Sequence, residues 1–174
     1  MEIQKTVKPT SYRVDPSFKH KVSKVPGGET LKFCYQCGTC TATCPIARFT
    51  DVYRPNKIIH LAKLGINNVS YSDAVWLCVT CYSCTERCPQ GVKVADVMRA
   101  LKNLAVEEGY EPTFAKAFAT NILNSGLAYS LPPSRILRRE SLGLPPLPQT
   151  KLSDLKKLAD LVGFSKLTQE GVQS

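Results

Sequence analysis

All eight cysteines of this 174-residue chain lie in two stretches that share one internal spacing. The first stretch reads CYQCGTCTATCP from Cys34 to Pro45, and the second reads CVTCYSCTERCP from Cys78 to Pro89. Both follow the pattern C-x2-C-x2-C-x3-C-P. Disulfides are disfavoured, because three evenly spaced thiols in one loop cannot pair locally without leaving one over. The cysteines therefore indicate metal binding.

The spacing also discriminates between kinds of metal site. Three thiolates at steps of three residues can all bend inward around one object. Zinc takes four tetrahedral ligands, usually from two separated C-x2-C pairs, and has no use for a third cysteine on the same tight turn. A cubane 4Fe–4S cluster takes three thiolates from such a loop and a fourth from elsewhere in the chain. The sequence thus predicts two 4Fe–4S clusters, with two zinc sites as the alternative.

We expect the two runs to exchange their last cysteines. In two-cluster ferredoxins the fourth cysteine of each run ligates the other cluster, and the proline that follows turns the chain away. The first cluster is then expected to be bound by Cys34, Cys37, Cys40 and Cys88. The second cluster is expected to be bound by Cys44, Cys78, Cys81 and Cys84.

Periodicity elsewhere predicts a mainly α-helical chain, with irregular loops at the cysteines and hardly any strand-like alternation. Residues suited to helix ends mark the expected helices, namely Pro55 and Gly65, Ser72 or Asp73, Gly109, Pro112 and Gly126, and Ser153. Helical segments between and after the two cysteine runs favour an α-helical ferredoxin-type domain over the compact βαβ ferredoxin.

This ferredoxin domain is expected to span residues 31–130. Residues 1–30 are expected to form an extended arm, because prolines and a Pro-Gly-Gly sequence interrupt any helical period. Residues 131–174 are expected to form a proline-rich basic linker and a C-terminal helix. The two ends carry most of the net charge of +9, with +4 in residues 1–33 and +3 in residues 131–174. We therefore expect both arms to dock on partners.

The N-terminal residues contain no apolar segment of the kind that a signal peptide requires. Nowhere does an apolar run reach the roughly 18 residues of a membrane-spanning helix. A soluble, cytoplasmic chain is therefore expected, in a compartment where thiols stay reduced. A basic surface can dock nucleic acid, anionic membrane or acidic proteins, and composition alone does not choose among them.

The sequence contains no glycine-rich nucleotide fingerprint, phosphate loop or nucleophile motif. With every cysteine used by a saturated cluster, no iron would have an open position for a substrate. We therefore expect an electron carrier without catalytic residues. Arg48, Arg54 and Arg87 could offset the negative charge of the clusters. Tyr71 and Trp76 are expected to pack in the core near Cys78, and His60 is expected at the surface.

Together the two cysteine runs, the helical spacer between them, the short chain and the basic tail resemble the C subunits of heterodisulfide reductases from methanogenic archaea. The resemblance covers most of residues 30–125. It implies a relay of electrons between the A and B subunits of that enzyme. The first of these bears a flavin and bifurcates electron pairs, and the second reduces the coenzyme M–coenzyme B heterodisulfide. The resemblance also implies a larger assembly with a hydrogenase or a formate dehydrogenase, and no contact with membrane or nucleic acid.

Other classes of protein fit the sequence less well. Catalytic subunits with noncubane clusters carry adjacent cysteines, and this chain has none. The iron–sulfur subunit of succinate dehydrogenase or fumarate reductase has a plant-type cluster domain in front, whereas no cysteine precedes Cys34. A free ferredoxin-like carrier is usually acidic, unlike this basic chain. A basic metal-binding nucleic-acid module would need a basic–aromatic pattern that the sequence lacks.

Overall fold

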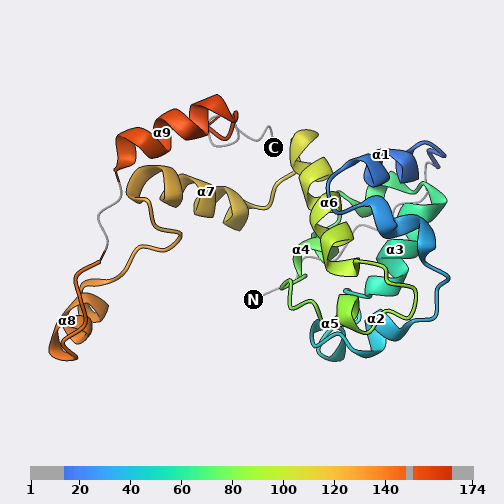
Figure 1. Ribbon diagram of the computed structural model, residues 1–174, viewed down its shortest axis with the longest axis horizontal. Helices are drawn as coiled ribbons and strands as arrows, with labels where there is room; N and C mark the ends of the chain where they lie inside the picture. The colour runs from blue at the N-terminus through green and yellow to red at the C-terminus, as the bar shows by residue number, and fades with distance from the viewer. Residues whose placement is uncertain (1–13, 148–150, 166–174) are drawn as a thin grey trace. The chain divides into compact units, whose positions relative to one another are not determined.

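The computed structural model describes residues 14–147 and 151–165. Within these residues the secondary structure is helical, without a named strand, and a single antiparallel bridge joins Val14 to Ile66. The expected mainly α-helical fold is confirmed (Figure 1). The α-helices are α1 (Phe18–Lys24), α2 (Thr39–Ala42), α3 (Pro55–Leu64), α4 (Asp73–Trp76), α5 (Ser83–Glu86), α6 (Val94–Glu107), α7 (Thr113–Ser125), α8 (Pro133–Ser141) and α9 (Leu152–Leu161). Three short 3₁₀ helices are η1 (Glu29–Phe33), η2 (Ile46–Arg48) and η3 (Asn67–Val69).

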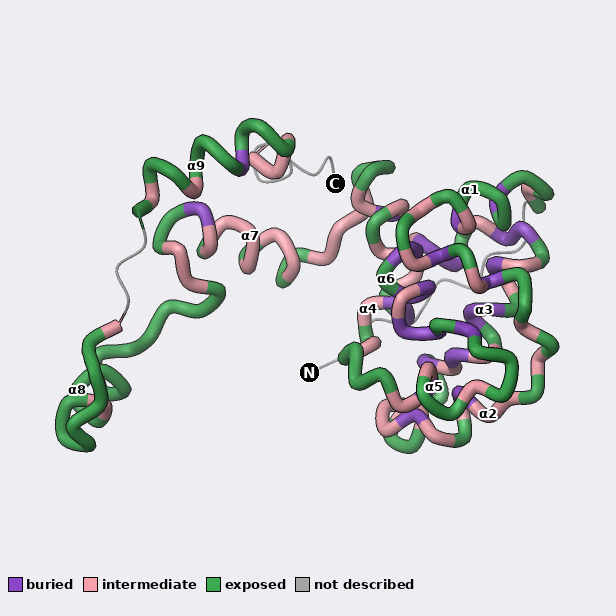
Figure 2. Tube along the Cα trace, in the orientation of Figure 1, coloured by how far each residue is buried: buried purple, intermediate pink, exposed green. Residues whose placement is uncertain are grey.

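The chain divides into two compact units, Met1–Tyr110 and Glu111–Ser174. In the first unit α3 and α6 pack against each other and against α1 and η1. Buried residues, drawn purple in Figure 2, gather on these helices. The most completely buried include Val22, Leu31, Ile59, Val97, Met98 and Leu101. These helices therefore form the scaffold from which the cysteine loops extend.

Helix ends in the first unit follow local sequence signals. Helix α3 begins at Pro55 and ends before Gly65, which adopts φ +82°. A Cβ atom at Gly65 would lie 2.2 Å from the carbonyl oxygen of Asp15, so only glycine fits there. The Ser72 hydroxyl accepts a hydrogen bond from the backbone N–H of Ala74 at 3.2 Å and caps α4. These sequence-based expectations are confirmed.

The N-terminal segment differs from the expected extended arm over residues 14–30. Residues 18–24 form α1, and the side chains of Phe18 and Val22 are buried in the core. Two apolar residues four positions apart give this short helix one buried face, although prolines flank it. Helix α1 is therefore part of the scaffold rather than an element free to dock elsewhere. Residues 1–13 lie outside the described residues.

The second unit begins earlier in the chain than the expected boundary at residue 131. Helix α7 packs against α9. Leu123 of α7 and Ala159 of α9 are buried. Phe118 and Tyr129 meet edge to face, with ring centroids 4.7 Å apart. Because α7 supplies half of this packing, it belongs with the C-terminal unit.

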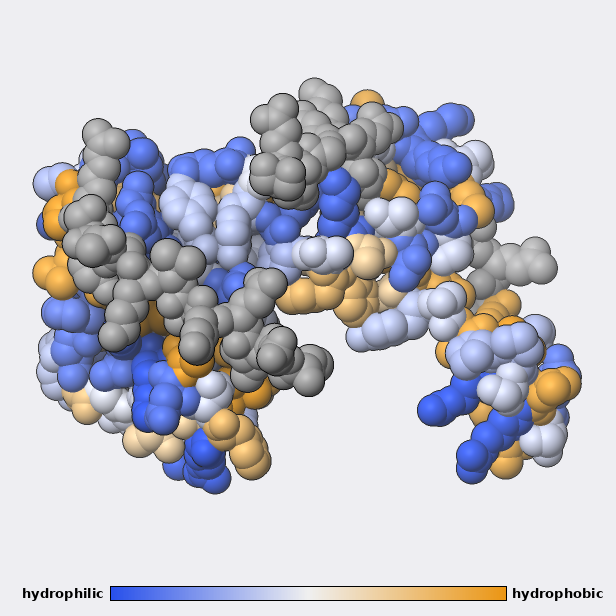
Figure 3. Space-filling model, turned by 180° about the vertical axis from the view of Figure 1, so that it is seen from behind, coloured by the Kyte–Doolittle hydropathy of each residue, from blue (hydrophilic) through white to orange (hydrophobic). Residues whose placement is uncertain are grey.

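Two further details of the C-terminal unit differ from expectation. The proline-rich segment contains helix α8, which starts at Pro133 because proline suits a first helical turn. All described side chains of α8 are exposed or half-exposed, and Figure 3 shows hydrophobic and hydrophilic ones side by side. Ser153 is not the cap of α9, since Lys151 occupies that position and Ser153 lies within the helix.

In the described residues, no helix is long and apolar enough to cross a membrane.

Candidate metal centre

Two cavities lie among the cysteine loops of the first unit, and four thiols line each one. The lining of the first cavity includes Cys34, Cys37, Cys40 and Cys88. The lining of the second cavity includes Cys44, Cys78, Cys81 and Cys84. Each cavity thus combines three cysteines of one run with the last cysteine of the other run.

None of the eight cysteines forms a disulfide. Among the described residues, no three His, Cys, Asp or Glu side chains converge on one point as the ligands of a single ion do. The four thiols of each set instead surround a space. A cluster with several metal atoms needs this arrangement, because each thiolate binds a different corner.

The two loops have the same backbone path. In each run the residue before the second cysteine has a left-handed backbone conformation. This residue is Gln36 in the first run, with φ +68°, and Thr80 in the second run, with φ +52°. The residue after the second cysteine has the same conformation in each run, with φ +81° at Gly38 and φ +62° at Tyr82. Non-glycine residues rarely adopt this conformation, so three of them here mark a backbone that is held to a required shape.

Tyr82 occupies the position that glycine holds in the first loop, and its contacts explain how it stays there. The Tyr82 hydroxyl donates to a carboxylate oxygen of Asp96 at 3.2 Å and accepts from Arg99 at 3.4 Å. Arg99 also forms an ion pair with Asp96 at 2.8 Å. Both partners lie on α6, so the ring ties the second loop to that helix.

A threonine in each run binds the start of the next long helix. Thr41, which follows the third cysteine of the first run, accepts a hydrogen bond from the N–H of Asn56 at 3.0 Å. Thr85, at the same position of the second run, accepts from the N–H of Ala95 at 3.1 Å. Each donor is the second residue of its helix, α3 or α6, where an N-cap side chain usually supplies the acceptor. The loops are thereby fixed on the two central helices.

The pKa values of the second and the third cysteine of each run shift in opposite directions. Burial, together with the charge of neighbouring cysteines, raises the pKa of Cys40 and of Cys84 to about 11. Hydrogen bonding to the hydroxyl two residues further on lowers the pKa of the exposed Cys37 and Cys81. Bound iron supplies the positive charge that stabilises crowded thiolates, so the cysteine sets fit a metal cluster.

Polar groups other than the cysteines also face the cavities. The Gln36 side-chain amide donates to Cys34 Sγ at 3.2 Å, and the N–H of Val92 donates to Cys88 Sγ at 3.3 Å. Tyr53 is buried against the second cavity, and desolvation and hydrogen bonding to Cys78 raise the pKa of its hydroxyl. Sequence reasoning missed these groups, because nothing in the local pattern around Gln36 or Tyr53 marks a cavity-lining side chain.

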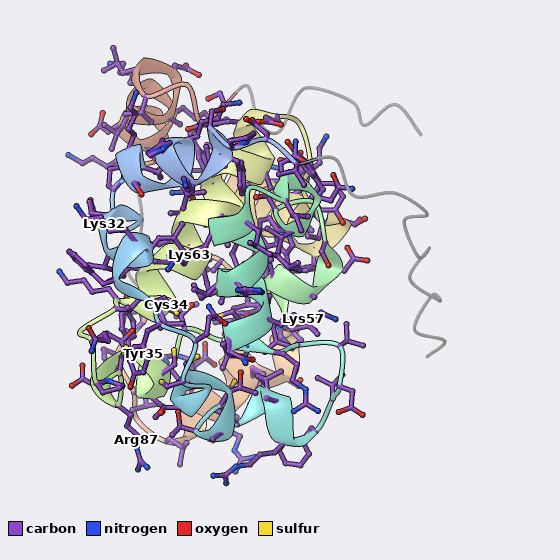
Figure 4. All side chains as sticks on the ribbon, turned by 90° about the vertical axis from the view of Figure 1, so that its right-hand side faces the viewer. Lys32, Cys34, Tyr35, Lys57, Lys63 and Arg87 are labelled. Atoms are coloured by element: carbon purple, nitrogen blue, oxygen red, sulfur yellow. The ribbon has the colours of Figure 1, made fainter. Side chains whose placement is uncertain are left out.

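The other polar candidates from the sequence lie outside the cavities. Arg48 and Arg87 are exposed, and Arg87 extends from the outer edge of the fold in Figure 4. Arg54 pairs with Asp51. Tyr71 packs edge to face on the ring of Tyr110, with centroids 6.0 Å apart. These arginines therefore lie on a solvated face in the structure.

Comparison with known proteins agrees with this geometry. A family model described as a 4Fe-4S dicluster domain matches residues 30–92, which include both cysteine runs. The fold and the site thus define a helical iron–sulfur protein that carries 4Fe–4S clusters, and a count of two is consistent with the dicluster domain.

Similar proteins of methanogens narrow this class. The chain is 37% identical over 161 residues to the C subunit of the H(2):CoB-CoM heterodisulfide,ferredoxin reductase of Methanothermobacter thermautotrophicus, covering 88% of this chain and 86% of the relative. It is 41% identical over 143 residues to the C2 subunit of the H(2)/formate:CoB-CoM heterodisulfide,ferredoxin reductase of Methanococcus maripaludis, covering 79% and 77%. It is 37% identical over 156 residues to the C subunit of the Ferredoxin:CoB-CoM heterodisulfide reductase of Methanosarcina mazei, covering 86% and 96%.

The chain belongs to the family of heterodisulfide reductase C subunits. Its relatives are iron–sulfur subunits of an oxidoreductase complex, which implies a role in electron transfer.

Proposed function

We propose that this chain relays electrons between the A and B subunits of a heterodisulfide reductase, from the flavin-containing one to the catalytic one that reduces the coenzyme M–coenzyme B heterodisulfide. The observation that carries the proposal is the use of all eight cysteines to line two cavities, four to each. Four thiolates are enough to ligate all the irons of one 4Fe–4S cluster, so no iron would keep an open position for a substrate. The chain would therefore carry electrons without taking part in the chemistry of disulfide cleavage.

The same geometry supports a crossed assignment of ligands. Cys34, Cys37, Cys40 and Cys88 would hold one cluster, and Cys44, Cys78, Cys81 and Cys84 would hold the other. When bound, the two 4Fe–4S clusters supply one-electron carriers. Helices α2 and α5, which carry Cys40 and Cys84, pack against each other, so the two cysteine sets are neighbours in the fold. Crossing would lock the two carriers close together.

The partners are proposed from the same relationship. The names of the relatives connect those proteins with H2, formate or ferredoxin. We propose that this chain joins the flavin-containing and the catalytic subunits, and that a hydrogenase or formate dehydrogenase feeds the assembly.

Reconstitution of the complex tests the relay. The flavin-containing and catalytic subunits are combined anaerobically with or without this chain, a low-potential donor reduces the flavin, and consumption of the heterodisulfide is measured. We expect consumption to need this chain, loaded with about eight irons and eight sulfides. The isolated catalytic subunit should remain active with an artificial dye donor. Equal consumption without this chain would contradict the relay, and a chain that binds zinc but no iron would contradict the cluster assignment.

A further inference from the structure

Two lysines bind the backbone of the cysteine loops from inside the fold. The ammonium group of Lys63 donates to the carbonyl oxygen of Cys34 at 2.5 Å and lies 3.4 Å from that of Lys32. The ammonium group of Lys102 donates to the carbonyl oxygen of Cys78 at 3.1 Å. Cys34 and Cys78 are the first cysteines of the two runs, so each lysine holds the same corner of its loop.

The two contacts are equivalent in the fold as well as in the sequence. Lys63 is the ninth residue of α3 and Lys102 is the ninth residue of α6. The second residues of the same helices, Asn56 and Ala95, donate to the threonines of the same two runs. Helix α3 therefore donates two hydrogen bonds to the first cysteine run, and α6 donates two to the second run. In each helix one donor lies in the first turn and the other lies two turns later.

These lysines differ from the solvated cations of the same unit. Both are half-buried, whereas Lys32 and Lys57 are exposed. The ammonium group of Lys102 also lies 5.5 Å from the centroid of the Trp76 ring. In Figure 4 Lys63 lies beside Cys34, whereas Lys57 lies on the other side of α3. A half-buried charge is screened by water and salt less than an exposed one.

We propose that Lys63 and Lys102 are a matched pair of positioning residues, one for each cluster, which hold the first-cysteine corner and favour the reduced state. The inference rests on the proposed pair of clusters. Reduction adds one electron to a centre that thiolates already make negative, and a fixed nearby cation stabilises the added charge. Because each lysine contacts a different run, each should act on its own cluster.

The test uses the full chain loaded with both clusters, in an anaerobic redox titration followed by electron paramagnetic resonance. Lys63→Met and Lys102→Met remove the cation, and Lys63→Gln and Lys102→Gln remove the charge but keep an N–H donor. Lys63→Arg and Lys102→Arg keep the charge. Lys57→Met is the matched control, because it removes an exposed lysine from the same helix as Lys63.

We expect Lys63→Met to lower the potential of one cluster and Lys102→Met to lower that of the other. The ratio of reduced to oxidised cluster at fixed potential should fall about tenfold, equivalent to about 59 mV for one electron. Arginine should restore most of the potential and Lys57→Met should leave it unchanged. If a methionine variant loses iron, the glutamine variant of the same position provides the measurement.

Two results would overturn the pairing of lysines with clusters. One is a full complement of iron and sulfide with potentials that move no more than in Lys57→Met. The other is a shift of the same cluster by both lysine variants. Failure of the underlying proposal is separate, because the unaltered chain would then lack the iron and sulfide of two clusters.

Discussion

The second and third cysteines have the same surroundings in both runs. The third cysteines, Cys40 and Cys84, are buried, whereas the second cysteines, Cys37 and Cys81, are exposed. The same order in both runs follows from the same backbone path, with left-handed residues on either side of the second cysteine. Among the eight cysteines, Cys37 and Cys81 are therefore the ones that a partner could approach most closely.

The crossed ligands give the first prediction at this scale. Cys44 belongs to the first run but lines the second cavity, and Cys88 belongs to the second run but lines the first cavity. Cys44→Ala should therefore damage the cluster held by Cys78, Cys81 and Cys84, most simply leaving a three-iron remnant. Cys88→Ala should damage the other cluster.

Spectra and potentials of the surviving clusters identify which cluster each variant has lost. In the assembled complex both variants should depress electron delivery, while the catalytic subunit keeps its activity with a dye donor. Crossed ligation would be rejected if Cys44→Ala and Cys40→Ala spoiled the same cluster. Loss of dye-driven activity in an intact complex would instead place this chain in the active site.

The threonines that bind the central helices give a second prediction. Thr85→Val removes the acceptor for the N–H of Ala95 at the first turn of α6. An unmatched donor at a helix start lowers the free energy of unfolding by about 1 kcal/mol. Thr85→Ser keeps the hydroxyl and should lose much less. Urea unfolding of the loaded chain measures the difference, and equal stability of the two variants would show that the hydrogen bond contributes nothing.

What the sequence could predict at this scale depends on the distance over which a residue acts. Cysteine spacing is a local pattern, so it was sufficient to predict 4Fe–4S clusters, which the match to a 4Fe-4S dicluster domain supports. The assignment of the eight cysteines to two crossed sets stays a prediction. Thr41 binds a residue fifteen positions away and Lys63 binds one twenty-nine positions away. Such contacts depend on how helices pack, and no periodicity in the sequence marks them.

Helix α6 is one of the two central helices of the first unit, together with α3. It packs against α1, α3, α4, α5 and η1. Its apolar stripe could be predicted from the sequence, and the structure confirms that Val94, Val97, Met98 and Leu101 are buried. Helices α1 and α8 were not expected, because a short segment between prolines gives too few residues for a helical period to be recognised.

Leu101→Ala tests the role of α6 as a scaffold. The Leu101 side chain is completely buried, and truncation to alanine leaves a cavity that lowers the free energy of unfolding by about 2–5 kcal/mol. Loss of α6 packing should also make both clusters more labile to chelators, since Val94 of α6 lines the first cavity and Ala95 lines the second. Leu137→Ala is the control, because Leu137 on α8 is 65% exposed. Equal urea midpoints for the two variants would contradict the scaffold role.

At the scale of the whole molecule, the cysteines and the basic helix α8 lie in different units. All eight cysteines lie in the first unit, whereas α8 in the second unit contributes three arginines and only one acidic residue. The match to the Methanothermobacter relative covers 88% of the chain, so it extends well beyond the cysteine runs. Because the second unit contains no cysteine, it cannot supply a cysteine ligand to a cluster. We predict that it contributes to association with partner subunits.

Charge reversal on α8 tests this role. Arg135 and Arg138 are exposed on a helix without buried residues, beside the exposed side chain of Leu137. Arg135→Glu with Arg138→Glu should weaken association with the flavin-containing and catalytic subunits on the order of tenfold at low salt, because two attractive contacts become repulsive. The defect should shrink as salt rises, since exposed charges are screened.

Arg135→Lys with Arg138→Lys keeps the charge and should bind nearly as well as the unaltered chain. Iron content should stay the same in all variants, because every cysteine lies in the other unit. Unchanged affinity and salt dependence in the glutamate variant would exclude α8 as a docking element.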